Sequence, residues 1–417
     1  MSENKKIPEI RFKGVSGEWD HKKLQDLTET GFSNGVFNDP QKVGKGYRLI
    51  NVKDMYSGDS IHIENLSLLD LDEKEFKNNK VEYGDIFFTR SSLVKEGIAY
   101  SNVNLSDRND ITFDGHLIRM QPCKATTNPV FLACLFKTPS AREQFILGGK
   151  TTTMTTIGQS DIATVALSLP CKQEQTKIGT IFQNLNTLIN QHQQKHDKLS
   201  NIKKAMLAKM FPKQGETIPE IRFKGFNVDW EESNLEKCTA LLTGNPFNSK
   251  EFTSEGYFLV RGMNVKRGYL DSSPEISEFW PSSKGLERYI LEPEDIVIQM
   301  DGALIGKSYA KINSRNLPAI LVQRVTRVRC SEVNPEFIYQ YIQRDFLTHI
   351  SGIKTETAVP HLSLHDIRAF SVFLPERAEQ NAIGDYFQNL DALINQHQQQ
   401  ITKLNHVKQA CLGKMFV

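Results

Sequence analysis

Residues 178–211 read IGTIFQNLNTLINQHQQKHDKLSNIKKAMLAKMF, and residues 383–416 read IGDYFQNLDALINQHQQQITKLNHVKQACLGKMF. Of the 34 aligned positions, 21 are identical. A shorter stretch is repeated as well, because IPEIRFKG occupies residues 7–14 and returns unchanged at residues 218–225. Two copies within one chain predict two similar modules related by an approximate two-fold axis.

Each copy of the longer repeat predicts one long helix, over about residues 174–211 and 379–416. Apolar residues recur there at alternating spacings of three and four, which is the pattern of a coiled-coil seam. A helix of this length needs a partner for its apolar stripe, and the matching stripes predict that the two helices pair antiparallel within the chain. The predicted helix-pairing residues are Leu185, Leu188, His192, Leu199 and Ile202 in the first helix and Leu390, Leu393, His397, Leu404 and Val407 in the second. The two histidines fit a polar layer that fixes the register.

The regions before the two helices share an order of elements but little identity. A short apolar strand leaving a turn is predicted within residues 84–90 and again within residues 294–300, and helices are predicted to begin at Asn128-Pro129 and Asn334-Pro335. Asparagine is a good N-cap, and proline suits the first helical position. A common scaffold with different side chains predicts two modules of different specificity.

Composition is that of a globular protein, with 39% hydrophobic and 24% charged residues and a net charge of +2. No run of 18 apolar residues occurs, and Met1–Lys6 lacks the apolar core of a signal peptide, so a cytoplasmic protein is expected. The six cysteines are scattered along the sequence, which favours reduced structural thiols over a zinc site or disulfides.

Sequence motifs of catalysis are missing from the chain. Residues 302–308 resemble a phosphate-binding loop but have three residues between the glycines where that loop needs four. Asn128-Pro129-Val130-Phe131 resembles an amino-methyltransferase motif, but its second proline is missing and no glycine-rich turn for a methyl donor precedes it. We therefore expect a protein that catalyses nothing itself.

The chain resembles the specificity subunit of type I restriction–modification systems. The resemblance is carried by the repeated IPEIRFKG stretch with its following tryptophan, the strands near Asp85 and Asp295, and the two repeated helices. It implies an α+β fold with two target-recognition domains of mixed short strands and helices, joined by two long conserved helices that pair as an antiparallel intramolecular coiled coil with pseudo-two-fold symmetry. The expected segments are recognition domain 1 at 1–171, spacer helix 1 at 172–212, recognition domain 2 at 213–376 and spacer helix 2 at 377–417.

The resemblance also implies the function and the partners. Each recognition domain is expected to read one half of a bipartite, asymmetric sequence in double-stranded DNA. The paired helices are expected to set the gap and to dock two methyltransferase (modification) subunits, and restriction (motor and nuclease) subunits complete the complex. No cofactor is expected on this chain: S-adenosylmethionine belongs to the methyltransferase partner, and ATP and Mg to the restriction partner. The alternatives are a coiled-coil assembly adaptor that does not bind DNA and, less well supported, a self-contained methyltransferase or nuclease.

Polar residues beyond the apolar strand of each copy are the predicted DNA contacts, because arginine, lysine, glutamine and hydroxyl side chains read base edges and phosphates. Solvated surface loops are the alternative for any one of them. The predicted DNA-binding residues are Arg90, Ser91, Ser92, Lys95, Lys150, Thr151 and Thr152 in the first copy and Arg261, Gln299, Asp301, Lys307, Lys354 and Thr355 in the second.

Overall fold

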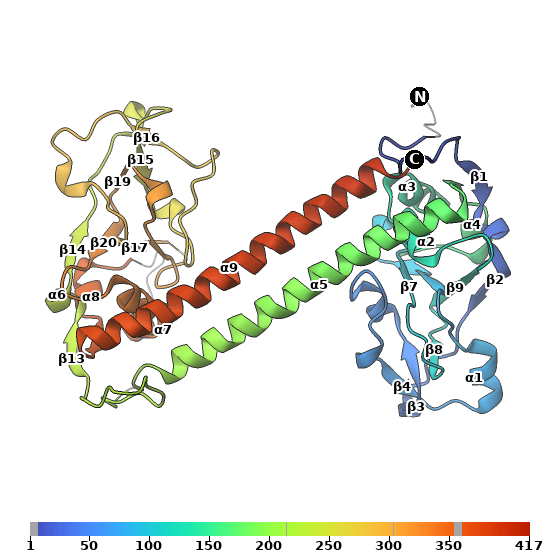
Figure 1. Cartoon of the computed structure of the whole chain (residues 1–417), viewed down its shortest axis with the longest axis horizontal. Coiled ribbons are helices and arrows are strands. Elements are labelled where there is room, and N and C mark those ends of the chain that lie inside the picture. Colours follow the sequence, from blue (N-terminus) through green and yellow to red (C-terminus); the bar gives the residue numbers. More distant parts are fainter. Residues whose placement is uncertain (1–6, 214, 303, 354–360) are drawn as a thin grey trace. The chain divides into compact units, whose positions relative to one another are not determined.

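Two compact units make up the chain (Figure 1). The first comprises Met1–Gln193 and Gln398–Val417, and the second comprises Gln194–His397. Each long helix therefore begins in one unit and ends in the other. The structure is a computed structural model that describes residues 7–213, 215–302, 304–353 and 361–417.

A four-stranded antiparallel sheet forms the centre of the first unit. Its strand order is β2 (Thr28–Asn34), β9 (Leu117–Pro122), β5 (Ile86–Thr89) and β7 (Ser101–Val103). Strand β5 is buried throughout and alternates between two cores: Ile86 and Phe88 join one apolar cluster, and Phe87 joins another. Because successive side chains of a strand point to opposite faces, a strand covered on both faces must be apolar throughout. This burial explains the apolar run at residues 86–88.

Shorter sheets and helices surround this sheet. A three-stranded sheet has the order β4 (Ser67–Leu69), β3 (Val43–Ile50) and β8 (Ile111–Phe113), in which β3 and β8 are parallel. Strand β1 (Asp20–Lys23) pairs antiparallel with β12 (Ala166–Leu169). The helices of this part are α1 (Glu73–Asn79), α2 (Pro129–Leu135), α3 (Pro139–Gly148) and α4 (Gln159–Ala163).

The second unit repeats these three sheets with the same strand orders. Its four-stranded sheet has the order β14 (Ala240–Thr243), β20 (Val325–Arg329), β17 (Ile296–Gln299) and β18 (Tyr309–Lys311). Its other sheets are β16 (Phe279–Trp280), β15 (Tyr257–Val260) and β19 (Ala319–Leu321), and the pair β13 (Glu231–Asn234) and β21 (Ser371–Leu374). The internal duplication therefore extends to the middle regions, where the sequences differ.

The helices after the central sheet differ between the units. In the first unit, α2 and α3 are separate, and Thr138 caps α3 in front of Pro139. In the second unit, one helix, α7 (Pro335–Ile353), occupies the equivalent stretch of chain, and α8 (Leu364–Arg368) follows it. Proline lacks the amide hydrogen that a helix interior needs and restricts the residue before it, so Pro139 divides the helical stretch of the first unit.

The predicted helix starts at Asn128 and Asn334 are confirmed. The side chain of Asn128 accepts a hydrogen bond from the Phe131 amide at 2.9 Å, and Asn334 does the same for Phe337 at 2.9 Å. A Cβ atom on Gly179 would lie 2.7 Å from Asn128 Oδ1. Only glycine therefore lets the capped end of α2 approach the long helix so closely.

The repeated IPEIRFKG stretch fastens each unit to a long helix. Arg11 Nε and NH2 donate to the two carboxylate oxygens of Glu174 at 2.9 and 2.7 Å, and the backbone amide of Ile10 donates to Lys414 O at 2.9 Å. In the second unit, Arg222 binds Glu379 in the same bidentate way, at 2.8 and 2.6 Å. The repeat is therefore structural in both copies.

The predicted long helices are confirmed as α5 (Lys172–Lys209) and α9 (Arg377–Lys414). In the first unit, the start of α5 packs near the end of α9, since the rings of Phe182 and Phe416 lie 5.7 Å apart. In the second unit, Phe211, just past the end of α5, lies 6.0 Å from Phe387 in the first part of α9. The helices therefore run antiparallel within one chain, as the repeats predict.

The predicted seam, meaning the line of side chains with which α5 and α9 face each other, includes three residues that are exposed. Leu188 and Leu393 were placed in it but are 43% and 44% exposed, and Val407 is exposed as well. The neighbouring Ile189 and Ile394 are partly buried instead. Both members of each Leu-Ile pair are apolar, so spacing alone could not decide which one faces the partner helix. The other predicted pairing residues, Leu185, His192, Leu199, Ile202, Leu390, His397 and Leu404, are buried or partly buried.

A charged pair lies inside the seam of the second unit. Lys203 Nζ donates to both carboxylate oxygens of Asp391 at 2.6 and 2.7 Å, and Gln340 Nε2 of α7 donates to the same carboxylate at 3.1 Å. Lys203 is buried. This network joins α5, α9 and α7 within the unit and favours one register of the helices.

Candidate nucleic-acid interface

The C-terminal end of β5 carries the predicted contacts of the first unit. Arg90 follows the strand directly, and Ser91–Ser92 form the short strand β6. Strand β6 pairs antiparallel with β11 (Thr155–Thr156), which pairs with β10 (Lys150–Thr151). The fold therefore brings two predicted stretches, about 60 residues apart in sequence, into one small three-stranded sheet.

The side chains of this sheet differ in exposure and in their hydrogen bonds. Ser92 Oγ accepts a hydrogen bond from the Val94 amide at 3.3 Å, and the hydroxyl of the exposed Thr151 lies 3.0 Å from that of the buried Thr155. Arg90 and Lys95 are exposed. The exposed group also includes Lys150 (whose Nζ lies 3.5 Å from Asp161), Thr151 and Thr152, while Ser91 and Ser92 are partly buried. Exposed cations among hydroxyl groups are the chemistry that binds phosphates and base edges.

The second unit places its predicted residues at the same end of β17. Gln299 ends that strand, and Asp301 forms an antiparallel bridge with His361 where the first unit has the β6–β11 pair. Asp301 Oδ2 accepts from Arg324 NH1 at 3.2 Å. Lys307 is exposed in the loop that leads to β18. Lys354 and Thr355 lie outside the residues that the structure describes.

Arg261 has a structural role that the sequence did not reveal. Its NH2 group donates to the carbonyl of Ile276 at 2.6 Å, and its guanidinium lies 5.8 Å from the centre of the Phe252 ring. A partly buried guanidinium that binds the backbone of its own domain holds a loop in place. These contacts of Arg261 within its own domain do not favour the predicted contact with DNA.

Two exposed residues beside the site were missed. The Arg90 amide donates to the carbonyl of His116 at 3.1 Å, and the Met300 amide donates to that of Arg324 at 2.9 Å. His116 and Arg324 thus occupy equivalent turns in the two units, each next to the end of the central strand. His116 Nδ1 lies 2.8 Å from the buried carboxylate of Asp114. No spacing rule connects these turns to residues 90 and 300, so the sequence offered no signal for them.

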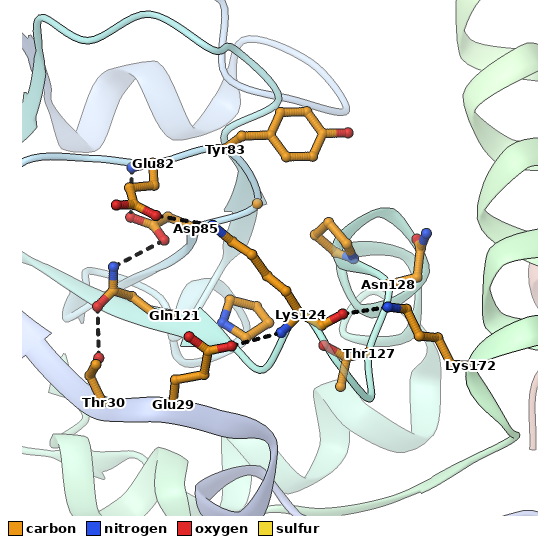
Figure 2. Close-up of a pocket in the computed structure, with 13 residues that line it drawn as sticks. Glu29, Thr30, Glu82, Tyr83, Asp85, Gln121, Lys124, Thr127, Asn128 and Lys172 are labelled. Carbon is orange, nitrogen blue, oxygen red and sulfur yellow. Dashed lines mark hydrogen bonds and ion pairs between the residues drawn. The ribbon is translucent and has the colours of Figure 1, made fainter.

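A cavity of about 480 Å³ lies at the other end of β5 (Figure 2). Asp85, which is 2% exposed, contributes its carboxylate to the lining together with Tyr83, Gln121, Asn128 and Lys172. The Glu82 amide donates to Asp85 Oδ2 at 3.0 Å, and Gln121 Nε2 lies 3.5 Å from Oδ1. Burial raises the pKa of Asp85 to about 6, although the backbone amide of Glu82, Arg119 NH1 at 3.8 Å and the side chain of Gln121 offset part of this effect.

The second unit fills the equivalent place with an arginine. The strand registers pair Ile86 with Met120 and Ile296 with Val328, so Gln121 and Arg329 are equivalent positions. Arg329 Nε and NH2 donate to the two oxygens of Asp295 at 2.7 Å each. The pseudo-symmetry is therefore broken at the buried acid: Asp295 has a bidentate guanidinium partner, whereas Asp85 has the amide of Gln121 beside it and Arg119 NH1 at 3.8 Å.

No candidate metal site is found among the residues that the structure describes. No group of three or more His, Cys, Asp or Glu side chains in residues 7–213, 215–302, 304–353 and 361–417 is arranged to hold a metal ion. The six cysteines form no disulfide in the structure, and burial raises the pKa of Cys134 to about 12. Among the helices described, none is both long enough and apolar enough to cross a membrane.

Two copies of one α+β scaffold, each presenting a different polar loop at the same strand end, define a protein with two related binding modules. The type I restriction modification DNA specificity domain matches residues 16–201 and again residues 227–406. These matches cover most of the chain, which therefore belongs to the family of type I restriction modification DNA specificity domain proteins.

Similar proteins include full-length and partial matches. The putative type I restriction enzyme MjaX specificity subunit of Methanocaldococcus jannaschii is 21% identical over 96% of this chain and 93% of its own length. The type I restriction enzyme EcoAI specificity subunit of Escherichia coli is 30% identical over 37% of this chain, and the match spans only 27% of that protein. The MjaVIII specificity subunit of M. jannaschii is 23% identical over 60% of this chain and 61% of its own length.

A solved structure has the same fold over nearly the whole chain. The type I restriction-modification system S subunit from M. genitalium superposes with a TM-score of 0.63, covering 99% of both chains at 15% sequence identity. At this identity the likeness concerns the fold: two mixed domains and two long helices.

Proposed function

We propose that this chain is the DNA sequence-specificity subunit of a type I restriction–modification complex, in which each unit reads one half of a bipartite, asymmetric target. The observation that carries the proposal is the equivalent placement of unlike side chains. At the end of the same central strand, the first unit presents the exposed Arg90 and the partly exposed Ser91, whereas in the second unit the equivalent Met300 is buried and the partly exposed Asp301 follows it. Family membership supports DNA as the ligand. Unlike contacts on a shared scaffold favour two different half-sites.

The long helices are proposed to set the gap between the half-sites. At 38 residues each, α5 and α9 are roughly 57 Å long at 1.5 Å per residue. Half-sites about one DNA turn apart, roughly 34–36 Å, lie within this length.

The same helices are proposed to dock two methyltransferase subunits. Leu188 and Leu393 are equivalent in the repeat, lie off the seam and are exposed. Because the two leucines occupy equivalent places in the repeat, they would give two copies of one partner equivalent positions to contact. Restriction subunits would join this assembly.

Catalysis is proposed to reside in the partners. The sequence has no Gly-x-Ser-x-Gly elbow, no His-Glu-x-x-His motif and no complete phosphate-binding loop. S-adenosylmethionine would be bound by the methyltransferase subunits, and ATP and Mg by the restriction subunits. The complex would act on DNA in the cytoplasm.

A domain exchange tests the proposal. Residues 20–165 of this chain are replaced by the equivalent residues of another family member, and the methylated sequences of a host carrying the exchanged chain and its methyltransferase are determined. One half-site should change while the other half-site and the gap stay as they are. Changes in both half-sites, or methylation without any sequence preference, would contradict the two-module account. An assembly adaptor would show no sequence-specific band shift with or without the methyltransferase.

A further inference from the structure

An aliphatic cluster protrudes from the middle of the polar surface of the first unit. Leu93 is 86% exposed, which makes it the most exposed large apolar side chain in the part of the chain that the structure describes, and Val94 is 60% exposed. Both follow β6 directly. Met154, which is also exposed, precedes β11. Because Ser92 pairs antiparallel with Thr155, Leu93 and Met154 occupy neighbouring positions on the two strands. We call Leu93, Val94 and Met154 the apolar tip.

The loop that carries the apolar tip is held in one conformation. Arg142 of α3 donates to three carbonyls at its base, those of Glu96 at 2.9 Å, Ile98 at 2.5 Å and Ala99 at 2.8 Å. The Gly97 amide donates to Val94 O at 3.1 Å. The fold therefore holds Leu93 and Val94 in place with their side chains exposed to solvent. A fixed exposed apolar group is typical of an interaction site.

The surroundings of the apolar tip indicate its partner. Arg90 and Lys95 flank it on its own strand and loop, and Lys150 and Thr152 flank Met154 on the neighbouring hairpin. Cationic side chains around a small apolar group complement a nucleic-acid duplex, because its phosphates are negatively charged and the stacked faces of its bases are apolar. Aliphatic side chains inserted between base pairs are a known way in which proteins kink DNA.

We propose that Leu93 and Val94 form a wedge that enters the stack of base pairs in the first half-site and unstacks one base step. The proposal rests on the proposed function and adds a mode of recognition to it. Flexible pyrimidine–purine steps are the cheapest to unstack, so the first half-site would be selected partly through its deformability at a position that no polar side chain contacts. The corresponding loop of the second unit exposes Leu304 to 52%.

Fluorescence of 2-aminopurine tests the wedge. The chain, in complex with its methyltransferase, is bound to duplexes of its target that carry 2-aminopurine at each position of the first half-site in turn. Wild type should raise the fluorescence at one step in addition to the base that the methyltransferase extrudes for methylation, because unstacking removes the quenching by neighbouring bases. The Leu93→Ser/Val94→Ser double variant should lose this signal and bind about tenfold or more weakly. Its melting temperature should stay unchanged, since both side chains are exposed.

The matched control is Val228→Ser, a change of an exposed aliphatic residue in the second unit. This variant should keep the signal and the affinity of wild type. If wild type binds its target specifically without a fluorescence rise beyond that of the extruded base, or if the double variant keeps the additional rise, the wedge is overturned while the proposed function stands. If wild type does not discriminate its target from other duplexes, the proposed function itself fails.

Discussion

Arg11 and Glu174 form a bidentate ion pair between residues 163 positions apart, with Nε–Oε1 and NH2–Oε2 distances of 2.9 and 2.7 Å. The Glu174 side chain is 1% exposed and lies in the first turn of α5, where the helix dipole favours a negative charge. Arg222 and Glu379 form the same pair in the second unit. Arg11 joins the first IPEIRFKG stretch to α5, and Arg222 joins the second IPEIRFKG stretch to α9. These contacts explain why an arginine recurs in both stretches.

Removing one partner of this pair should destabilise the first unit. We expect Glu174→Ala to lower the free energy of unfolding by about 3 kcal/mol, because the Arg11 guanidinium is left largely buried without its counter-ion. Urea denaturation measures the change. Asp70→Ala is the control, since the Lys45–Asp70 pair is exposed and should contribute little to stability. Equal losses in the two variants would contradict the prediction.

The buried carboxyl of Asp85 should make stability depend on pH. Its pKa in the fold is about 6, above the ordinary 3.8, so the folded state holds this proton more tightly than the unfolded state. The contribution of Asp85 to stability therefore rises as pH falls from about 6 to about 4 and is lost above pH 6. Asp85→Asn should remove it, so the variant should gain up to about 3 kcal/mol relative to wild type between pH 4 and pH 7.5. A difference between the two proteins that does not change with pH would contradict this.

Gln121→Arg should reproduce in the first unit the ion pair that Arg329 makes with Asp295. A guanidinium at this position can reach the carboxylate of Asp85, and the cavity beside it has room for the longer side chain. We expect the pKa of Asp85 to fall below its wild-type value of about 6, and the unfolding free energy at pH 7.5 to increase by about 1–2 kcal/mol. NMR titration of the carboxyl and urea denaturation measure the two effects. Gln121→Lys tests whether the planar guanidinium is needed.

Arg90→Ala should relax the first half-site alone. An exposed arginine at the end of β5 is placed to bind a base edge or a phosphate, and loss of a base contact should reduce discrimination at one position by about 1–3 kcal/mol. Methylome sequencing with the variant shows which half-site has changed. Arg261→Ala is the contrasting variant, because its guanidinium binds Ile276 O. It should lower the stability of the second unit. Relaxation of the second half-site by Arg90→Ala would contradict the assignment.

Four residues inserted before Lys198 should lengthen the gap and leave both half-sites as they are. One added helical turn extends α5 by about 6 Å, close to two base-pair steps of 3.4 Å. Some loss of stability is expected, since the seam must shift its register. Methylome sequencing of the insertion variant against wild type gives the gap length. A change in the recognised bases would contradict the role of the helices as a spacer.

The sequence predicted those helices whose residues carry a local pattern, either a repeated stretch or a regular spacing of apolar residues. Identity between residues 178–211 and 383–416, with regular apolar spacing, was enough for both long helices and their pairing. The sequence placed Leu188 in the seam in place of Ile189, because each of these adjacent apolar residues fits a spacing of three or four. The choice between them depends on the partner helix, which the spacing does not describe.

The candidate interface was predicted only in part, because its geometry depends on contacts between distant residues. The exposed residues at the end of β5 follow from the apolar run before them. Their assembly with residues 150–152 depends on strands of two residues each, which are too short to leave a pattern. Likewise, the contact of Arg11 with Glu174 and the position of His116 beside Arg90 depend on the folded structure, and no pattern in the sequence predicts them.

The positions of the ion pairs also bear on how such a protein diversifies. Arg11, Glu174 and Gly179, which fasten the first unit to its helix, lie close to or within the repeats, whereas the exposed loops lie between them. Mutations in the loops therefore leave the fastening intact, and a gene segment bounded by the repeats can be exchanged as a block by recombination. Under the proposed function, such an exchange would change the sequence read by one unit and leave the sequence read by the other unit as it is.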